Sequence, residues 1–302
     1  MYSLGLTTPL EQILKKAGIT CIVYKDTVAN PTSANVEDAK NLYLKKHCQA
    51  LLAFGGGSSM DCAKGVGARL ARPNKSLAKM EGILHVMHKL PLLIAVPTTA
   101  GTGSETTLAA VITDADTHHK YAINDFSLIP HYAVLEPEVT VGLPPQLTAT
   151  TGMDALTHAI EAYIGRSTTK QTRKAAIEAI QLIFQYLPVA YKNGKNRTAR
   201  KEMLRASYLA GTAFTKSYVG YVHAVAHSLG VSTASRMDWQ TPFFFRSFSK
   251  RTEAPRTKNW LTSPGSPNFF FPGRYHRSQC FYRTYPKNER FHEHTDDPRR
   301  YP

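Results

Sequence analysis

Two pairs of polar residues lie four positions apart, inside segments that are otherwise apolar and rich in alanine. Asp154 and His158 form the first pair, and His223 and His227 form the second. Residues four apart share one face of an α-helix, so each pair presents its polar groups in one direction. Carboxylate oxygens and imidazole nitrogens are ligands for Fe²⁺ and Zn²⁺. One such pair alone is weak evidence, but buried polar groups need partners, so two apolar helices that carry them predict one shared metal site.

A run of three glycines and a serine, Gly55 to Ser58, directly follows the apolar segment ALLAF (50–54). The next residues, SMDCAKGVGARLA, are typical of a helix and place Asp61 in its first turn. Glycines allow the backbone to approach a pyrophosphate closely, and a helix N-terminus offers N–H groups and a positive dipole end. The sequence therefore favours a phosphate-binding turn, although an ordinary glycine-rich turn remains the alternative for this motif alone.

A second loop of similar character, PTTAGTGSE (97–105), follows the apolar segment LLIAV (92–96). Its hydroxyls and backbone N–H groups suit the oxygens of phosphate and ribose, although connectors of this composition are also common as plain loops. Lys120 can add a cation to the same phosphates, the alternative being a solvated surface lysine. Two such loops after parallel strands together favour a nucleotide site.

Short apolar, β-branched segments alternate with helical patterns through residues 1–140, which is typical of βαβ units around a parallel sheet. The predicted strands are ITCIVYK (19–25), ALLAF (50–54), LPLLIAV (90–96), LAAVIT (108–113) and YAVLE (132–136). Between the first two, VEDAKNLYLKKH (36–47) has apolar residues at helical spacing. We therefore expect an α/β dinucleotide-binding domain with a parallel sheet over residues 1–143.

The pattern changes near Pro144 to long, Ala-rich amphipathic stretches. These stretches are QLTATTGMDALTHAIEAYIG, KAAIEAIQLIFQYLPVAYK, RKEMLRASYLAGTAFTK and YVHAVAHSLG. They predict an all-α metal-binding domain over residues 144–230. After Gly230 the sequence turns into clusters of Pro, Arg, Ser and Phe with neither helical nor strand period, so residues 231–302 are expected to form a disordered tail.

The length and cysteine content suit an intracellular enzyme. A chain of 302 residues is long enough for two domains. Its four cysteines have no CxxC spacing, which is typical of reduced thiols rather than of a disulfide framework. The N-terminus lacks an apolar core of signal-peptide length, and no later run approaches the roughly 18 apolar residues of a membrane span. We expect a cytoplasmic protein without a membrane partner.

The net charge of +15 raises nucleic acid as a partner, but its distribution argues against that interpretation. Residues 231–302 hold 13 Lys and Arg against 6 Asp and Glu, so nearly half of the net charge lies on less than a quarter of the chain. From the set Ala, Val, Ile, Leu and Met, this tail contains five residues, too few for an aliphatic core. Nucleic acid is therefore an improbable partner for the preceding 230 residues.

The motifs GGGSSMDCAK, PTTAGTGSE, GLPPQLTATTGMDALTHAIEAY and HAVAHSLG, in this order and spacing, resemble the iron-containing alcohol dehydrogenase family over residues 4–230. The resemblance implies NAD or NADP between the two domains and Fe²⁺, with Zn²⁺ as a possible replacement. The cofactor-binding residues that it implies are Gly56, Gly57, Ser58, Asp61, Thr98, Thr99, Thr102 and Lys120. The metal ligands that it implies are Asp154, His158, His223 and one further histidine.

The resemblance also implies the reaction. The metal ion acts as a Lewis acid on the oxygen of a small alcohol or aldehyde, and hydride passes between that substrate and nicotinamide. His227, one turn beyond His223, is implied to lie beside the metal and to help carry the proton. A homodimer is a further expectation from the family.

The sequence departs from the family pattern at both ends. Family members have several tens of residues, including a first nucleotide-binding strand, before the point that matches Leu4, so we interpret the N-terminus as truncated. The family's fourth metal ligand is the histidine of a Pro-His-Gly segment, where this chain has Met237. A thioether is a poor Fe²⁺ ligand compared with imidazole. Residues 232–248 read in a shifted frame can give QHGIPHGLANAVLLPFV, which puts a histidine at position 237, so the tail looks frame-shifted.

Three functions of different class follow from these observations. The first is an active metal- and NAD(P)-dependent alcohol dehydrogenase, impaired by the missing ligand. The second is an inactive truncated and frame-shifted product. The third is a basic nucleic-acid-binding module built on an enzyme remnant, for which the scattered aromatics and arginines of the tail give weak support. The alcohol, the choice between NAD and NADP, and the metal stay open.

Overall fold

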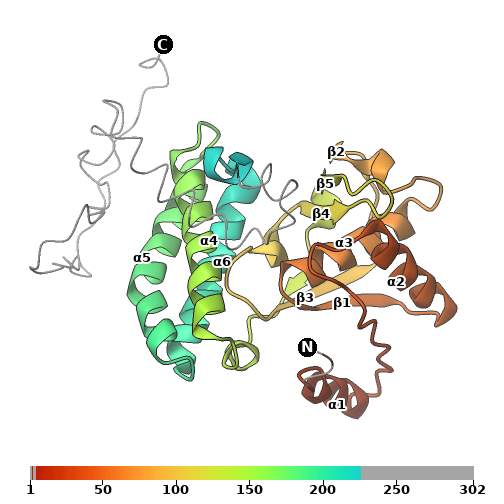
Figure 1. The fold of residues 1–302 in the computed structure, drawn as a ribbon, viewed down its shortest axis with the longest axis horizontal. Helices are drawn as coiled ribbons and strands as arrows, with labels where there is room; N and C mark the ends of the chain where they lie inside the picture. Colours follow the sequence, from red (N-terminus) through yellow and green to blue (C-terminus); the bar gives the residue numbers. More distant parts are fainter. Residues whose placement is uncertain (1, 3–4, 226–302) are drawn as a thin grey trace, which may run out of the picture. The chain divides into compact units, whose positions relative to one another are not determined.

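The computed structural model describes residue 2 and residues 5–225 of the chain. In chain order its main helices and strands are α1 (Thr8–Lys16), α2 (Ser33–Lys45), β1 (Ala50–Gly55), α3 (Gly57–Ala71), β2 (Gly82–Ile83), β3 (Leu92–Pro97), β4 (Ala109–Thr113), β5 (Lys120–Asn124), β6 (Tyr132–Ala133), α4 (Pro145–Ile164), α5 (Lys170–Lys192) and α6 (Arg197–Ser217). All the described strands precede α4, so an α/β part is followed by a helical part (Figure 1). The predicted tail, residues 231–302, lies outside the described residues.

One sheet of the α/β part is parallel and has the order β1–β3–β6. β1 pairs with β3 along its whole length, from Ala50 opposite Leu92 to Gly55 opposite Pro97. Because the carboxyl ends of parallel strands meet at one edge of a sheet, the segments that follow β1 and β3 emerge side by side. The predicted parallel sheet is confirmed, and the two glycine-rich loops are neighbours.

A second sheet, in the order β2–β5–β4, departs from the all-parallel expectation. β4 and β5 are antiparallel, with Thr113 opposite Lys120. The turn between them is short, and Asp114 Oδ1 accepts hydrogen bonds from the backbone N–H groups of Asp116 and Thr117. Such a turn joins antiparallel strands, whereas a parallel crossover needs about a dozen residues or more. The predicted LAAVIT strand is therefore β4, and it forms a hairpin with β5.

The prediction of a buried strand at residues 19–25 is wrong. These residues have no regular secondary structure, and Ile19 and Ile22 are exposed. A strand is stabilised by hydrogen bonds and side-chain contacts with its neighbours. Among the described strands, β1 stands at the edge of its sheet and pairs with β3 alone. Among the described residues, the apolar, β-branched segment 19–25 pairs with no strand, and composition alone does not make it one.

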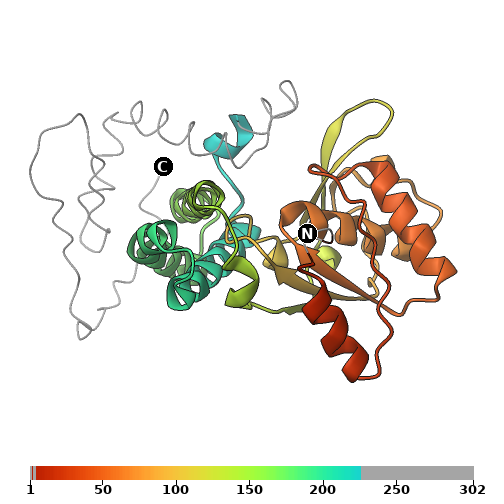
Figure 2. The same ribbon diagram turned by 60° about the horizontal axis from the view of Figure 1, so that its bottom comes forward.

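The helical part confirms the predicted Ala-rich helices. α4, α5 and α6 pack against one another, as Figure 2 shows. Ala162, Ala176 and Ala213 form a buried cluster, one from each helix, and such small side chains let helices approach closely. None of the described helices is both long and apolar enough to cross a membrane. The domain boundaries after residues 143 and 230 stay predictions, although α4 begins at Pro145.

The second loop (97–105) is packed tightly against this helical part. A Cβ added to Gly101 would lie 2.8 Å from Thr151 Cβ on α4, and one added to Gly103 would lie 2.7 Å from Gly211 Cα on α6. Real Cβ atoms do not approach that closely, so these positions require glycine. Because Thr151 lies one turn before Asp154, the loop contacts the helix that carries the predicted metal ligands.

Candidate functional site

The first loop (55–58) and the second loop (97–105) converge at the ends of β1 and β3. Thr98 N–H donates a hydrogen bond to the carbonyl oxygen of Gly55 at 2.9 Å. A Cβ added to Gly56 would lie 3.2 Å from Thr99 Oγ1, and one added to Gly57 would lie 3.0 Å from Thr102 Cγ2. The backbone of the first loop therefore faces the threonine side chains of the second. The structure brings together five of the predicted cofactor-binding residues at this point.

The N-terminus of α3 lies at the same place. The helix begins at Gly57, and its N-cap residue, Gly56, offers no side chain to cap it. The first N–H groups of a helix lack partners within the helix and carry its positive dipole end. No side chain caps this helix N-terminus, and an uncapped N-terminus after a glycine is the geometry of many phosphate sites.

Lys120 and Ser58 are brought to one side of this turn by Asn30. Lys120 Nζ donates to Asn30 Oδ1 at 3.0 Å, and Asn30 N–H donates to Ser58 Oγ at 3.3 Å. Burial lowers the pKa of Lys120, while the carboxylate of Asp61 opposes that change. Lys120 thus lies beside the first loop, and its contact with cofactor phosphates stays a prediction. Asn30, which has a left-handed backbone (φ 56°), was not foreseen, although Asn before Pro31 in a turn is a recognisable signal.

Asp61 is partly buried beneath the two loops rather than open to them. Its Oδ1 accepts a hydrogen bond from Ser104 Oγ at 3.0 Å, and its Oδ2 accepts one from Val111 N–H at 3.2 Å. Burial raises its pKa, while the nearby Lys64 ammonium and these hydrogen bonds oppose the rise. Both carboxylate oxygens are engaged within the protein. A direct contact between Asp61 and a cofactor stays a prediction.

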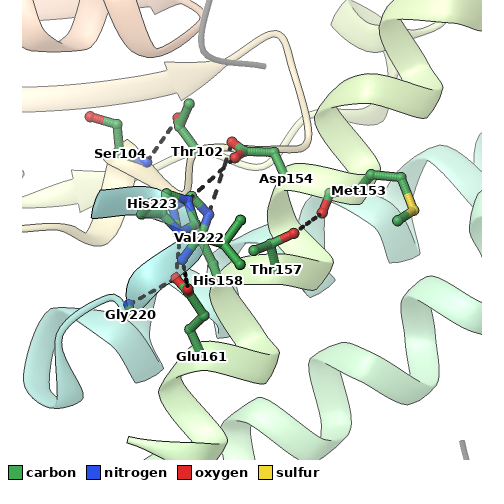
Figure 3. Close-up of polar contacts among 10 residues, drawn as sticks. All are labelled: Thr102, Ser104, Met153, Asp154, Thr157, His158, Glu161, Gly220, Val222 and His223. Atoms are coloured by element: carbon green, nitrogen blue, oxygen red, sulfur yellow. Dashed lines mark hydrogen bonds and ion pairs between the residues drawn. The ribbon is translucent and has the colours of Figure 1, made fainter. Parts of the chain in front are cut away.

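The predicted metal ligands meet in the helical part. Asp154 and His158 lie on α4 and His223 lies after α6, and all three are buried. One potential ligand atom from each lies within 4.8 Å of the others. His223 Nε2 is 3.5 Å from Asp154 Oδ1, and His158 Nδ1 is 3.9 Å from Asp154 Oδ2. Figure 3 shows the three side chains turned toward one point.

Glu161 holds the segment that carries His223. Its Oε2 lies 2.5 Å from His223 Nδ1 and accepts a hydrogen bond from Gly220 N–H at 2.8 Å. Its Oε1 accepts one from Val222 N–H at 2.7 Å. Burial raises the pKa of Glu161. The hydrogen bond and the charge of His223 lower it by more than burial raises it, so the pKa falls below its ordinary value. One carboxylate on α4 therefore fixes both the backbone and the imidazole of this segment (Figure 3).

The imidazole of His223 lies between two carboxylates. Burial lowers its pKa, but the hydrogen bonds and charges of Asp154 and Glu161 outweigh burial and raise it to about 9. The ring of His158 stacks between those of Phe214 and His223, with ring centroids 4.3 Å and 4.1 Å away. These contacts leave both imidazoles little freedom to rotate. The ligand positions are held by the protein fold.

The donor set fits a divalent transition metal. Two imidazole nitrogens and one carboxylate oxygen are ligands that Fe²⁺ and Zn²⁺ take in catalytic sites with three protein ligands. A carboxylate that accepts from the second nitrogen of a ligating histidine is a common supporting contact, and Glu161 is placed to make it. His227 and Met237 lie outside the described residues.

The residues that sequence analysis missed have signals of different strength. Glu161 lies seven residues after Asp154, so the helical spacing that paired Asp154 with His158 extends to it. Its partners Gly220 and Val222, however, are far away in the sequence. Phe214 had no signal beyond its place on an amphipathic helix.

Two family models match the chain. "Iron-containing alcohol dehydrogenase" matches residues 1–137, and "Fe-containing alcohol dehydrogenase family, C-terminal" matches residues 148–234. The second match ends close to Gly230, where the sequence pattern of the family was found to stop. The two matches cover both the nucleotide loops and the metal cluster.

Individual relatives agree with these matches. Alcohol dehydrogenase 4 of Schizosaccharomyces pombe is 43% identical over 230 residues, which are 76% of this chain and 54% of that protein. NAD-dependent methanol dehydrogenase of Bacillus methanolicus is 38% identical over 230 residues, which are 76% of this chain and 60% of that protein. This chain thus spans little more than half the length of these curated relatives.

Solved structures give the same result. The crystal structure of sulfoacetaldehyde reductase from Bifidobacterium kashiwanohense in complex with NAD⁺ has a TM-score of 0.74 and 31% identity, covering 83% of this chain and 67% of that one. The family matches and the likeness to a solved structure therefore agree. The chain belongs to the iron-containing alcohol dehydrogenase family.

Proposed function

We propose that this chain is an alcohol dehydrogenase that depends on a divalent metal and on NAD or NADP, and that it transfers hydride between a small alcohol or aldehyde and nicotinamide. The observation that carries the proposal is the buried convergence of Asp154, His158 and His223. The names of relatives support the class, since they include an alcohol dehydrogenase and an NAD-dependent methanol dehydrogenase. Because the chain spans little more than half of these relatives, the activity of the whole protein is a proposal.

In this function the residues of the helical part hold the metal. Asp154, His158 and His223 supply the ligands, and Glu161 keeps the His223 ring oriented by accepting from its Nδ1. A bound Fe²⁺ or Zn²⁺ supplies Lewis-acid polarisation of the substrate oxygen. Burial of all three ligands keeps water from competing for that position.

The loops of the α/β part hold the dinucleotide. Gly56, Gly57 and Ser58 present backbone N–H groups to the pyrophosphate at the N-terminus of α3. Thr98, Thr99 and Thr102 add hydroxyls from the second loop, and Lys120 adds a positive charge. Nicotinamide, as the hydride carrier, supplies the redox chemistry.

The proposal includes lower turnover for this chain than for a family member that has a fourth, imidazole metal ligand. The resemblance implies that ligand where the sequence has Met237. Three protein ligands without it bind Fe²⁺ more weakly than four do, since metal affinity depends on the number and type of ligands. His227 stays a proposed proton carrier, and a homodimer stays a family expectation.

The test measures metal content by mass spectrometry together with NAD-dependent oxidation of short primary alcohols and diols. The chain is compared with a version whose residues 232–248 are replaced by QHGIPHGLANAVLLPFV, which restores a histidine at position 237. We expect more bound metal and faster turnover in the replaced version. Equal metal content and turnover in both would contradict the proposed impairment. No NAD-linked oxidation by either protein would contradict the proposed function.

A further inference from the structure

Lys64 is a fully buried lysine on α3, two turns after the first loop. Its Nζ atom donates to Ser104 Oγ at 3.0 Å and to the carbonyl oxygen of Ala109 at 2.8 Å. It also donates to both oxygens of Thr107, the carbonyl at 2.8 Å and Oγ1 at 3.0 Å. An ammonium group has three N–H donors, and four protein oxygens surround this one. No donor of Lys64 is left for a ligand.

The oxygens around Lys64 belong to one stretch of chain, from the end of the second loop into β4. Asp61, one turn earlier on α3, contacts the same stretch through Ser104 Oγ and Val111 N–H. The Ser104 hydroxyl accepts from Lys64 and donates to Asp61, so it joins the two side chains. The helix thus fixes this stretch at several successive points.

The same helix carries the first loop at its N-terminus. Gly56 and Gly57 lie against Thr99 and Thr102 of the second loop, as close as 3.0 Å when a Cβ is added. A rigid α3 therefore sets the distance between the two loops. It holds the first through its own N-terminus and the second through Lys64 and Asp61.

The ammonium group of Lys64 is held by hydrogen bonds inside the protein. Burial lowers its pKa to about 8, and the carboxylates of Asp61 and Glu105 oppose that change. A buried ammonium is tolerated only where it is hydrogen-bonded and paired. Lys120 differs from Lys64 in burial and in position. It is only partly buried, and its Nζ reaches Asn30 beside Ser58 of the first loop.

We propose that Lys64 is a positioning residue of the dinucleotide site, which acts through Ser104 and Thr107 to hold Thr99 and Thr102 over the first loop without touching the cofactor. This inference rests on the proposed function. Of the two lysines near the glycine-rich loops, Lys64 sets the geometry of the site, and Lys120 meets the phosphates. The two roles predict different responses to substitution.

The test compares Lys64→Met with Lys120→Met in the full chain, with ADP-ribose as the probe, because it needs neither metal nor hydride transfer. Calorimetry gives its dissociation constant at two salt concentrations. Lys64→Met should weaken binding about tenfold, since it leaves buried oxygens without a donor, and should keep the salt dependence of the unaltered chain. Lys120→Met should weaken binding and also flatten the salt dependence, because it removes a charge from the phosphates.

Two further measurements separate positioning from a general loss of stability. Thr107→Val, a milder change, should weaken ADP-ribose binding in the same direction, and the double variant Lys64→Met/Thr107→Val should bind no worse than Lys64→Met alone. Zn²⁺ affinity of the Asp154 cluster should be unchanged in all three variants. Additive losses, or parallel losses of Zn²⁺ binding, would mean that Lys64 serves only general stability.

Hydrogen exchange of the amides in residues 98–109 decides the inference independently of any cofactor. Lys64→Met should speed exchange there and leave α5 unchanged. Unchanged exchange in residues 98–109, or ADP-ribose binding equal to that of the unaltered chain, overturns the positioning role. No ADP-ribose binding by the unaltered chain would instead overturn the proposed dinucleotide function.

Discussion

The nucleotide loops and the metal cluster differ in what carries their chemistry. In the loops the proposed recognition groups are mostly backbone N–H groups and hydroxyls, and Gly56 and Gly57 matter because they have no side chain. In the cluster the proposed recognition groups are three buried side chains, and their identity would decide which ion binds. The loops should therefore be sensitive to added atoms and the cluster to removed ones.

Buried charge is handled differently in the two regions as well. Beneath the loops, Lys64 Nζ is surrounded by oxygens of Ser104, Thr107 and Ala109, so its donors are satisfied without a ligand. In the cluster, His223 stands between two carboxylates that a divalent cation can also neutralise. In the proposed function the first arrangement supports the dinucleotide site, whereas the second is itself the metal site.

The largest expected effect comes from removing the central imidazole of the cluster. His223→Ala leaves the buried carboxylates of Asp154 and Glu161 without their shared partner, which should cost about 3–5 kcal/mol of folding free energy. Urea unfolding of the metal-free protein measures it. His119→Ala, which removes an exposed histidine paired with Glu81, is the matched control and should change stability little. Equal losses of folding free energy in His223→Ala and His119→Ala would show that the buried cluster does not depend on its central imidazole.

The next effect tests sensitivity of the loops to added atoms. Gly56→Asp puts a carboxylate beside the proposed phosphates and against Thr99, so ADP-ribose binding should weaken on the order of 100-fold through like-charge repulsion. Gly56→Ala, which adds a Cβ but no charge, should lose less. Zn²⁺ binding should be the same in both variants. If Gly56→Asp bound ADP-ribose as the unaltered chain does, the loop would not be a phosphate site.

Glu161→Gln tests the orientation of His223, a proposed metal ligand, and a smaller effect is expected. An amide in place of the carboxylate no longer accepts from His223 Nδ1 with a full charge, so Zn²⁺ affinity should fall about 10-fold to 100-fold. Calorimetric titration with Zn²⁺ measures it. Glu138→Gln, at an exposed ion pair with Arg197, is the control and should bind Zn²⁺ normally. Unchanged affinity in Glu161→Gln would remove its supporting role.

The last effect concerns the pH dependence of stability beneath the loops. Burial raises the pKa of Glu105 from its ordinary value of 4.5 to about 7, although its own backbone N–H and Lys64 oppose the rise. A raised pKa in the folded state gives stability that is complete below pH 4.5 and is lost as pH rises through about 7.

Glu105→Gln should therefore flatten the fall in stability over this window, by about 3 kcal/mol or less. Thermal unfolding between pH 4.5 and 7.5 measures the slope for both proteins. Glu138→Gln serves as the exposed control here too. Parallel slopes in the unaltered chain and in Glu105→Gln would show that Glu105 is not held neutral.

The sequence predicted the parts of the site that depend on local spacing. Asp154 and His158 share a helical face, and both glycine-rich loops follow strands that are indeed adjacent and parallel. Their predictions needed only the period of a helix and the rule that ligands bind at the carboxyl ends of parallel strands.

The rest depends on contacts between distant segments. Residues 19–25 have the composition of a strand. Whether such a segment becomes a strand depends on pairing with a neighbouring strand. Lys64 looks like an ordinary helix lysine until the fold brings Thr107 and Ala109 around it. Glu161 lies at helical spacing from Asp154 and His158, yet its role requires Gly220 and Val222 to come close to its carboxylate. Gly220 comes so close that an added Cβ would lie 2.8 Å from Glu161 Oε1.

The central claim is that Asp154, His158 and His223 hold one divalent metal ion in a chain that also binds a dinucleotide. Its most direct test is titration of the metal-free chain and of Asp154→Ala, first with Zn²⁺ and then with ADP-ribose. The account predicts one Zn²⁺ per chain, lost in Asp154→Ala, with ADP-ribose binding retained in both proteins. Equal Zn²⁺ binding by the unaltered chain and by Asp154→Ala would contradict it.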